Sequence, residues 1–320
     1  SIKKDTISIS GILYSPPNFL RMLAYLELSR PAGDVSRWEK VMKRLSLLNT
    51  HYPMTTEKCN YSNYQRTFDS NNKELVTKLY EVTKQSFINQ GVIFFGGFAS
   101  FLYSQYMNKS VRNKFTEQPD FDILSENAHK TCIILKERLN DADINDVSIV
   151  KRPSLGEIIA THYEVRVGKD TIAFVYEPLS CHSYNVITIG KNKIKVATID
   201  TMLSFYLAFI YANRPYYDSN RILCMSTFLF YVQQKNRLKQ KGLLRRFSIS
   251  CMGKQHSLED IRGEKANKFK ELSSNRNSTE YEMWFLKYRP EEKNKKNKNK
   301  KPKNTIKSKV SSKKTTRKKK

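Results

Sequence analysis

The chain has 320 residues, of which 39% are hydrophobic and 12% aromatic, and this suffices for one large folded domain or two modest ones. Its formal net charge is +27; residues 293–320 contribute 15 lysines or arginines and no acid, which leaves +12 for the rest. This excess indicates a polyanionic partner. There is neither a signal-peptide pattern nor a run of about 18 apolar residues, so we expect no secretion and no membrane span.

The cysteines and histidines show no metal-ligand spacing. The five cysteines are scattered without a C-x-x-C pair, which predicts free thiols in a reducing compartment and no structural zinc site. We interpret His162 and His182 as ordinary strand or loop residues. The first residue is Ser1 and not methionine, which indicates a processed chain or a fragment of a longer protein.

The N-terminal part predicts one strand and two helices. Residues 5–14 alternate in polarity like a short strand. A helix is expected from Ser15-Pro16-Pro17, because proline is tolerated in the first helical turn, and it ends in the polar segment 29–34. A second amphipathic helix is predicted over 35–48. Residues 55–72 are polar and have the composition of a linker.

The segment from 92 to 126 carries the strongest functional pattern. After an amphipathic helix predicted over 73–90, residues 92–95 predict a buried strand, followed by a Gly96-Gly97 turn and a helix over 98–107. Glycines at a helix start let a phosphate approach bare N–H groups, where the helix dipole favours an anion. Gly96 and Gly97 are therefore candidate nucleotide-binding residues.

A second short strand carries Asp120 and Asp122. Their spacing of two places both carboxylates on one face of a strand. Two like charges this close repel unless a cation lies between them, and Mg²⁺ prefers oxygen ligands. A GG pair or a D-x-D motif alone is weak evidence. In this order, however, a phosphate cradle and a metal-binding carboxylate pair are what nucleotidyl transfer needs.

A third carboxylate is expected from a hairpin further along the chain. A helix over 128–139 and a strand over 147–150 precede two strands, 158–167 and 171–177, which turn at Gly168-Lys169-Asp170. With Lys169-Asp170 as the turn, Glu164 and Glu177 share a face with Ala173 and Val175. Two-metal phosphoryl transfer commonly uses a third acid.

Of the two acids, Glu177 is favoured, because it ends its strand just before a proline. Glu164 is the alternative third acid. For either residue, the alternative to a catalytic role is that of an ordinary solvent-exposed glutamate. Arg166 on the same face would contact a nucleotide triphosphate or neutralise Glu164.

A motif occurs twice in the remaining sequence. A short strand at 194–196 precedes an apolar helix over 201–213 and a further helix over 218–234. Between these helices lies R-P-x-x-D-x-x-R, starting at Arg214, and the same motif starts at Arg30 between the two N-terminal helices. The shared context of strand, helix, motif and helix favours an internal duplication. Residues 1–54 are then the end of a first unit whose own site would precede Ser1.

The sequence beyond residue 240 has fewer signals. Residues 242–289 are basic and polar with a few apolar anchors, notably Trp284 and Phe285, and are interpreted as a terminal extension. From Lys293 onward the Lys/Asn/Ser/Thr composition predicts disorder. Such a tail attracts RNA or DNA without sequence preference. A nuclear-localisation signal and solvated disorder without a dedicated role are the alternatives.

Four stretches resemble the poly(A) polymerases of large cytoplasmic DNA viruses, the mimivirus, asfarvirus and poxvirus group. They are FFGGFASFLY, PDFDILSEN, FVYEP and YSPPNFLRMLAYLELSRPAGDVSRWEKVMKRLSLLNTHYP, within a similarity that covers most of residues 5–235. The resemblance implies two nucleotidyltransferase-like subdomains in tandem, the first catalytic and the second largely degenerate. It also implies transfer of AMP from ATP to viral mRNA 3′ ends with Mg²⁺ or Mn²⁺, by a homodimer in the host cytoplasm, at the viral factory, with packaging into the virion as an alternative.

The expected fold class is α/β (α+β), with tandem polymerase-beta-like nucleotidyltransferase subdomains, the first present only as its C-terminal helices. The expected divisions are 1–54, the end of the first unit; 55–72, a linker; 73–240, the second unit; 241–290, a basic extension; and 291–320, a disordered tail. This second unit departs from the degenerate family pattern by keeping Gly96, Gly97, Asp120 and Asp122, with a glutamate where the third acid is usually Asp.

Three functions follow as hypotheses. In the first, Asp120, Asp122 and Glu177 bind two metals and catalyse adenylyl transfer to RNA, while Gly96, Gly97 and Arg166 bind ATP. In the second, the unit is a catalytically silent module for RNA binding and dimerisation. In the third, it is a small-molecule or protein nucleotidyltransferase, for which a polybasic tail is not required.

Overall fold

The structure is a computed structural model that describes residues 6–54, 56, 59, 72–115, 118–156, 158–212 and 214–285. The chain divides into two compact units, Ser1–Leu258 (the large unit) and Glu259–Lys320 (the small unit). The helices before residue 54 and the sheet after residue 90 belong to the same unit, and the division comes after residue 258 where residue 240 was expected. Apart from residues 56, 59 and 72, the predicted linker lies outside the described residues, as does the whole predicted tail.

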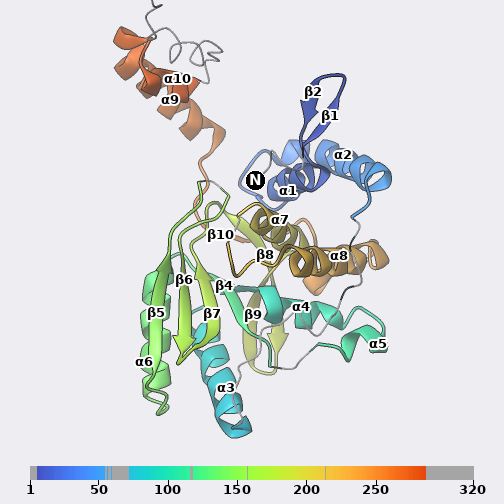
Figure 1. Ribbon diagram of the computed structural model, residues 1–320, viewed down its shortest axis with the longest axis vertical. Helices are drawn as coiled ribbons and strands as arrows, with labels where there is room; N and C mark the ends of the chain where they lie inside the picture. Colours follow the sequence, from blue (N-terminus) through green and yellow to red (C-terminus); the bar gives the residue numbers. More distant parts are fainter. Residues whose placement is uncertain are drawn as a thin grey trace, which may run out of the picture. The chain divides into compact units, whose positions relative to one another are not determined.

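A mixed sheet of eight strands forms the centre of the large unit (Figure 1). Its strand order is β10-β8-β9-β3-β4-β7-β6-β5. β3 pairs antiparallel with β4 and parallel with β9, whereas β4 and β7 are parallel. The strands are β3 (Ile93–Phe95), β4 (Phe121–Leu124), β5 (Val147–Arg152), β6 (His162–Val167), β7 (Asp170–Tyr176), β8 (His182–Ile189), β9 (Asn192–Ala197) and β10 (Cys251–Met252).

Helices cover both faces of this sheet (Figure 1). On one face lie α3 and α6, and there Phe87 packs edge-on against Phe94 and Phe121. Successive strand residues face opposite sides, so Phe95 points to the other face, where Phe205 of α7 stacks on it. The helices are α3 (Lys73–Asn89), α4 (Gly96–Ser104), α5 (Lys109–Arg112), α6 (Ala128–Asn140), α7 (Ile199–Ile210) and α8 (Ser219–Lys235), with the 3₁₀ turn η4 (Gly242–Leu244). Over the described residues, no helix has both the length and the apolar character needed to span a membrane.

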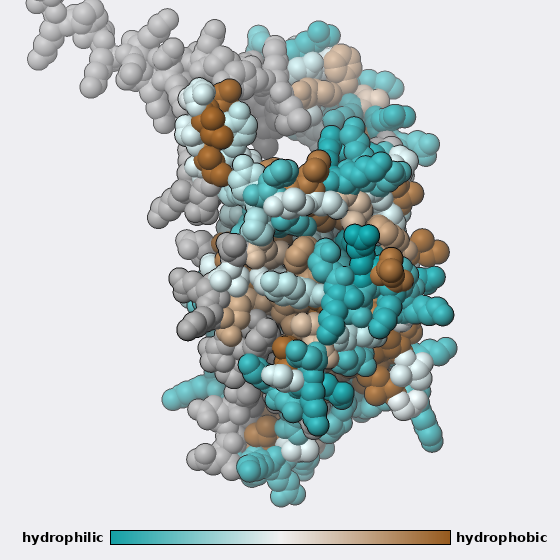
Figure 2. Space-filling model, turned by 90° about the vertical axis from the view of Figure 1, so that its right-hand side faces the viewer, coloured by the Kyte–Doolittle hydropathy of each residue, from teal (hydrophilic) through white to brown (hydrophobic). Residues whose placement is uncertain are grey.

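The N-terminal residues form a small sheet of their own, where a single strand was predicted. β1 (Ile7–Ile9) and β2 (Ile12–Tyr14) pair antiparallel around a Ser10-Gly11 turn. All six strand residues are exposed, although five are large and apolar. In Figure 2 a narrow hydrophobic stripe stands out near the top of an otherwise mostly hydrophilic face, at the level of this hairpin. An isolated two-stranded hairpin is marginally stable in water, so burial of these side chains against another layer would stabilise it.

The two R-P-x-x-D-x-x-R motifs have the same structural role. Asp34 accepts a hydrogen bond from the Ser36 N–H at 3.1 Å and caps η2 (Val35–Arg37), which leads into α2 (Trp38–His51). Asp218 accepts one from the Arg221 N–H at 2.6 Å and caps α8. An antiparallel hairpin precedes each helical pair: β1–β2 before α1 (Pro17–Leu28) and β8–β9 before α7. The likeness between the two segments thus extends to hairpin, helix, motif and helix, and the duplication itself stays a prediction.

The prediction that all five cysteines are free thiols is wrong for this structure. Cys59 is bonded to Cys224, and Cys181 to Cys251. The bonded cysteines are 165 and 70 residues apart in the sequence, so the local spacing of cysteines could not predict these disulfides. Cys132 of α6 is free and buried, and its burial raises the pKa of the thiol to about 12.

The small unit contains α9 (Leu258–Leu272) except for its first residue, together with η5 (Ser273–Asn275) and α10 (Thr279–Phe285). The two residues predicted as anchors pack within it. The ring of Trp284 lies 5.8 Å from Lys268 Nζ, and Phe285 packs edge-on against Phe269 at 5.8 Å. Most other side chains of α9 are exposed, as its polar sequence leads one to expect.

Candidate functional site

The diglycine forms the first turn of α4 and not a separate turn before it. β3 ends at Phe95, and α4 begins at once with Gly96, whose φ of +66° is a conformation that L side chains rarely adopt. Both glycines are buried. The chain therefore passes from a strand straight into a helix with backbone N–H groups at its start, which is the local geometry that the pattern predicts.

The two aspartates lie directly against this helix start. A Cβ atom at Gly96 would overlap the carboxylate of Asp122, and a Cβ atom at Gly97 would lie 2.5 Å from Oδ1 of Asp120. Asp120 is 9% exposed and precedes β4, whereas Asp122 is half-buried within β4 opposite Phe95. The structure thus brings Gly96, Gly97 and both aspartates together, and only glycine leaves room for the carboxylates there.

Glu177 lies elsewhere. In the sheet, Asp122 has Phe95 on one side and Phe174 of β7 on the other. The β7 residues on the face of Asp122 are Phe174, Tyr176 and, across a bulge at Ile172, Thr171, so this strand provides no acid there. Glu177 follows the end of β7, and the alternation places it with Val175 on the opposite face. The structure therefore does not bring Glu177 to the aspartate pair.

A bulge explains why the predicted face was wrong. The turn consists of Gly168-Lys169, because Val167 pairs with Asp170, and Gly168 has a φ of +59°. Compared with the predicted turn at Lys169-Asp170, this turn shifts the pairing of β6 with β7 by two residues, so by itself it leaves the predicted faces unchanged. The pairing then shifts again between Val165 and Arg166, which adds one residue and reverses every face beyond it. Glu164 consequently pairs with Phe174 and shares a face with Asp122.

Glu164, the alternative third acid, is engaged by neighbouring side chains. It is 3% exposed and accepts hydrogen bonds from Arg152 at 2.6 Å, Arg166 at 2.7 Å and Thr171 at 2.5 Å. Burial alone would raise its pKa, but the hydrogen bonds from Arg166, Thr171 and Arg152 lower the pKa of Glu164 to about 2. It lies two strands from Asp122, or roughly 10 Å between backbones. Arg166 thus neutralises Glu164, one of the two roles expected for it.

Tyr206 lies within electrostatic reach of both aspartates and of Arg221, and the sequence did not mark Tyr206 or Arg221 as site residues. Burial raises the pKa of Tyr206, the charges of Asp122 and Asp120 raise it further, and Arg221 opposes this. The Tyr206 hydroxyl lies 3.4 Å from Oγ of Ser100, in the helix that the diglycine begins. Arg221 is the last residue of the second R-P-x-x-D-x-x-R motif, and the repetition of that motif was the sequence feature that could have pointed to it. Tyr206 had no signal beyond lying in an apolar helix.

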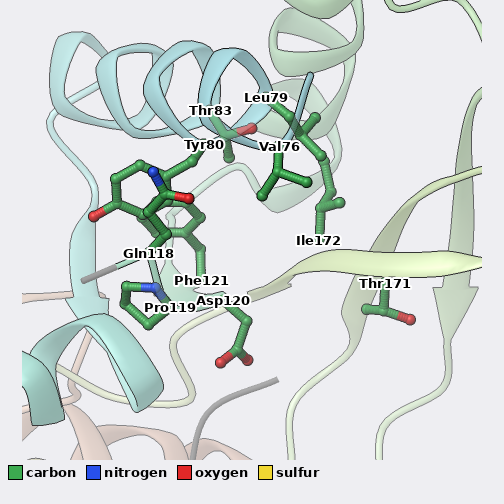
Figure 3. Close-up of a pocket in the computed structure, with 10 residues that line it drawn as sticks. All are labelled: Val76, Leu79, Tyr80, Thr83, Gln118, Pro119, Asp120, Phe121, Thr171 and Ile172. Atoms are coloured by element: carbon green, nitrogen blue, oxygen red, sulfur yellow. The ribbon is translucent and has the colours of Figure 1, made fainter. Parts of the chain in front are cut away.

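A small cavity beside Asp120 is not a nucleotide site. It is lined by α3, residues 118–121 and β7, and its volume is about 40 Å³. This is space for about one water molecule. In Figure 3 the carboxylate of Asp120 points away from the apolar side chains of Val76, Leu79 and Ile172. The charged end of Asp120 therefore belongs to the α4 side of the sheet and not to this cavity.

The donor set of the site fits one divalent cation. Asp120 and Asp122 offer the oxygen ligands that Mg²⁺ and Mn²⁺ prefer, and water and phosphate oxygens would complete the shell of one ion. In the described part of the chain, no group of three or more His, Cys, Asp or Glu side chains is placed to hold a metal. The three-carboxylate arrangement of two-metal phosphoryl transfer does not fit these residues.

The large unit has a polymerase-like nucleotidyltransferase fold. In it, a strand leads into the diglycine helix and a neighbouring strand carries the D-x-D motif, within a mixed sheet that has helices on both faces. Among solved structures, the chain is similar to the crystal structure of the Megavirus polyadenylate synthase, with a TM-score of 0.66 and 20% sequence identity. The match covers 96% of this chain and 64% of that one, so this chain spans less than two thirds of its neighbour's length. No protein-family model and no curated protein matches the sequence.

Proposed function

We propose that this chain is part of a protein that transfers AMP from ATP to RNA 3′ ends without a template. Within it, the large unit acts as a catalytically silent module for RNA binding and dimerisation. The fold of a viral polyadenylate synthase over 96% of the chain supports the first part. The charge of +27 supports an RNA partner, and it disfavours a small-molecule nucleotidyltransferase, which needs no such charge.

One observation carries the silent role. Phe174 occupies the β7 position next to Asp122, where a third carboxylate would complete the site. It is 1% exposed, and Tyr216 stacks on it with ring centroids 5.4 Å apart. Glu164 is held by arginines two strands away, and Glu177 belongs to the opposite face. With one ion at most, the site lacks the second metal that would activate the attacking hydroxyl.

The N-terminal hairpin supports a further unit of the same kind. Its counterpart in the repeat, β8–β9, lies inside the large sheet between β10 and β3. By the same logic β1–β2 belongs to a second sheet, and residues 1–54 are the end of the unit that carries the active carboxylates. That unit would use Mg²⁺ or Mn²⁺ with ATP. The complete protein would act as a homodimer in the host cytoplasm, at the viral factory, with packaging into the virion as an option.

The test is incorporation of labelled ATP onto oligo(A) by the 320-residue chain, with Mg²⁺ or Mn²⁺. We expect no incorporation with either metal. Incorporation that Asp120→Ala abolishes would overturn the silent role and restore the reading of Asp120 and Asp122 as catalytic.

Binding of the same oligo(A), followed by fluorescence anisotropy over a range of salt concentrations, tests the RNA partner. Binding should weaken as salt rises, and deletion of 293–320 should flatten that dependence. Absence of binding at low salt would refute the RNA role. An unchanged slope after the deletion would show that the tail serves another purpose.

A further inference from the structure

A cavity between α1 and α7 is distinct from the aspartate pair. Its volume is about 220 Å³, and most of its wall is apolar, with Phe19, Met22 and Leu26 on α1 and Phe205 and Ala208 on α7. The two helices pack side by side in the large unit (Figure 1). None of the lining residues belongs to the Gly96-Gly97 turn or the D-x-D strand. We call this cavity the His182 pocket, after the polar residue at the start of β8.

His182 has unused hydrogen-bonding capacity. It is 2% exposed, it lines the pocket, and neither Nδ1 nor Nε2 has a hydrogen-bond partner. Burial, with the charge of Arg30 adding to it, lowers the pKa of His182 to about 3, so the ring is neutral at pH 7. A neutral imidazole offers one donor and one acceptor. Leaving both unsatisfied in an apolar surrounding is unfavourable, so a ligand with a matching polar edge would be stabilised here.

Arg30 adds positive charge to the same pocket. It lines the cavity and lies close enough to influence the titration of His182. Its counterpart in the repeat, Arg214, donates instead to the carbonyl of Pro153 at 3.1 Å. A guanidinium at a pocket wall is suited to a phosphate group, which it can bind through two parallel N–H donors.

We propose that the His182 pocket binds a purine nucleotide, with the base against the apolar wall, its polar edge at His182 and its phosphate toward Arg30. Size supports this, because a cavity of about 150 Å³ holds a benzene ring, so the larger pocket has room for a bicyclic base. Aromatic walls and hydrogen bonds to base edges are how unpaired bases are recognised. The choice of ligand rests on the proposed function, since a protein that handles ATP and RNA meets both free nucleotides and single-stranded bases.

The experiment measures binding of AMP to the 320-residue chain by saturation-transfer NMR and titration, without metal. His182→Leu removes both ring nitrogens while keeping an apolar side chain. It should weaken AMP binding about tenfold or more, because a hydrogen-bonded edge is lost. Arg30→Met should weaken AMP binding but leave adenosine binding unchanged, because adenosine has no phosphate. Arg214→Met, at the matched motif position, should bind AMP like the parent chain.

Folding is monitored separately by thermal unfolding. His182→Leu should unfold no earlier than the parent chain, because it removes an unsatisfied polar group. A variant that unfolds early is replaced by His182→Phe. Absence of AMP and oligo(A) binding to the parent chain would refute the pocket. Equal AMP binding by the parent, His182→Leu and Arg30→Met would refute it as well.

Oligo(A) and AMP are compared to identify the source of the base. If His182→Leu weakens oligo(A) binding by a larger factor than AMP binding, the pocket holds a base of RNA; the reverse result assigns it to a free nucleotide. No turnover is measured. A failed AMP experiment therefore leaves the adenylyl-transfer proposal standing, and failure of that proposal leaves the binding result unaffected.

Discussion

At the scale of residues, the first role of Gly96 and Gly97 is to leave space for the two aspartate side chains. Gly96 faces the carboxylate of Asp122, and Gly97 faces that of Asp120, so each glycine leaves the space that one carboxylate occupies. Glycine is thus needed here for packing, whether or not a phosphate is ever bound.

Gly96→Ala should be more destabilising than a change at another glycine of similar backbone conformation. Gly96 and Gly190 have φ of +66° and +60°, but a Cβ atom at Gly190 meets nothing within 4 Å. Each alanine costs about 1–2 kcal/mol for its backbone. Gly96→Ala should cost about 1–3 kcal/mol more, because its Cβ overlaps Asp122. Urea unfolding of both variants measures the difference, and equal losses would contradict the packing role.

Glu164 should make stability depend on acid pH. Its pKa is about 2, below the ordinary 4.5, because of hydrogen bonds from Arg166, Thr171 and Arg152. Its contribution is therefore complete above about pH 4.5 and is lost as the pH falls toward 2. Glu164→Gln should lower the free energy of unfolding at pH 7 by about 1–3 kcal/mol. Across that window it should also lose stability less steeply than the parent chain. Parallel pH profiles from chemical unfolding would argue against this network.

At the scale of elements, a buried ion pair joins α7 to the segment before β10. Arg246, 9% exposed, holds Asp200, 1% exposed, through two hydrogen bonds of 2.5 and 3.1 Å. Arg246→Met leaves the aspartate buried and unpaired, and should cost about 3–5 kcal/mol. The exposed pair of Arg37 and Glu27 is the control, and Arg37→Met should cost no more than about 1 kcal/mol. Similar unfolding midpoints for the two variants would count against a structural role for the buried pair.

The sequence predicted best where one local pattern decides the structure. β3, the helix that follows it and the D-x-D strand each have a strong signal, and their order made the fold class predictable. The face of Glu164 was not predictable, because a bulge at Val165 and Arg166 has no sequence signature of its own. β8 was missed because buried polar residues such as Ser183 and Asn185 obscure its alternation. Asn185, for example, donates to the carbonyls of Leu243 and Arg245, far along the chain.

At the scale of the whole molecule, two disulfides join distant parts of the large unit. Titration of thiols under denaturing conditions, on protein prepared without reductant, should find one thiol, that of Cys132. The same protein after reduction should show five. Three or five thiols before reduction would mean that one or both pairs stay reduced in solution.

Phe174 has a consequence for how such a unit would gain or regain catalysis. An acid at this position would have the right neighbour in Asp122, yet it would lie beneath Tyr216, whose hydroxyl lies 3.0 Å from Nε2 of His162. A single Phe174→Asp change would bury a charge in an aromatic stack and be removed by instability before any activity could be selected. The aromatic cover must open in the same step. If the unit is catalytically silent, as we propose, gaining activity at this position would therefore take at least two substitutions, one at Phe174 and one in its aromatic cover.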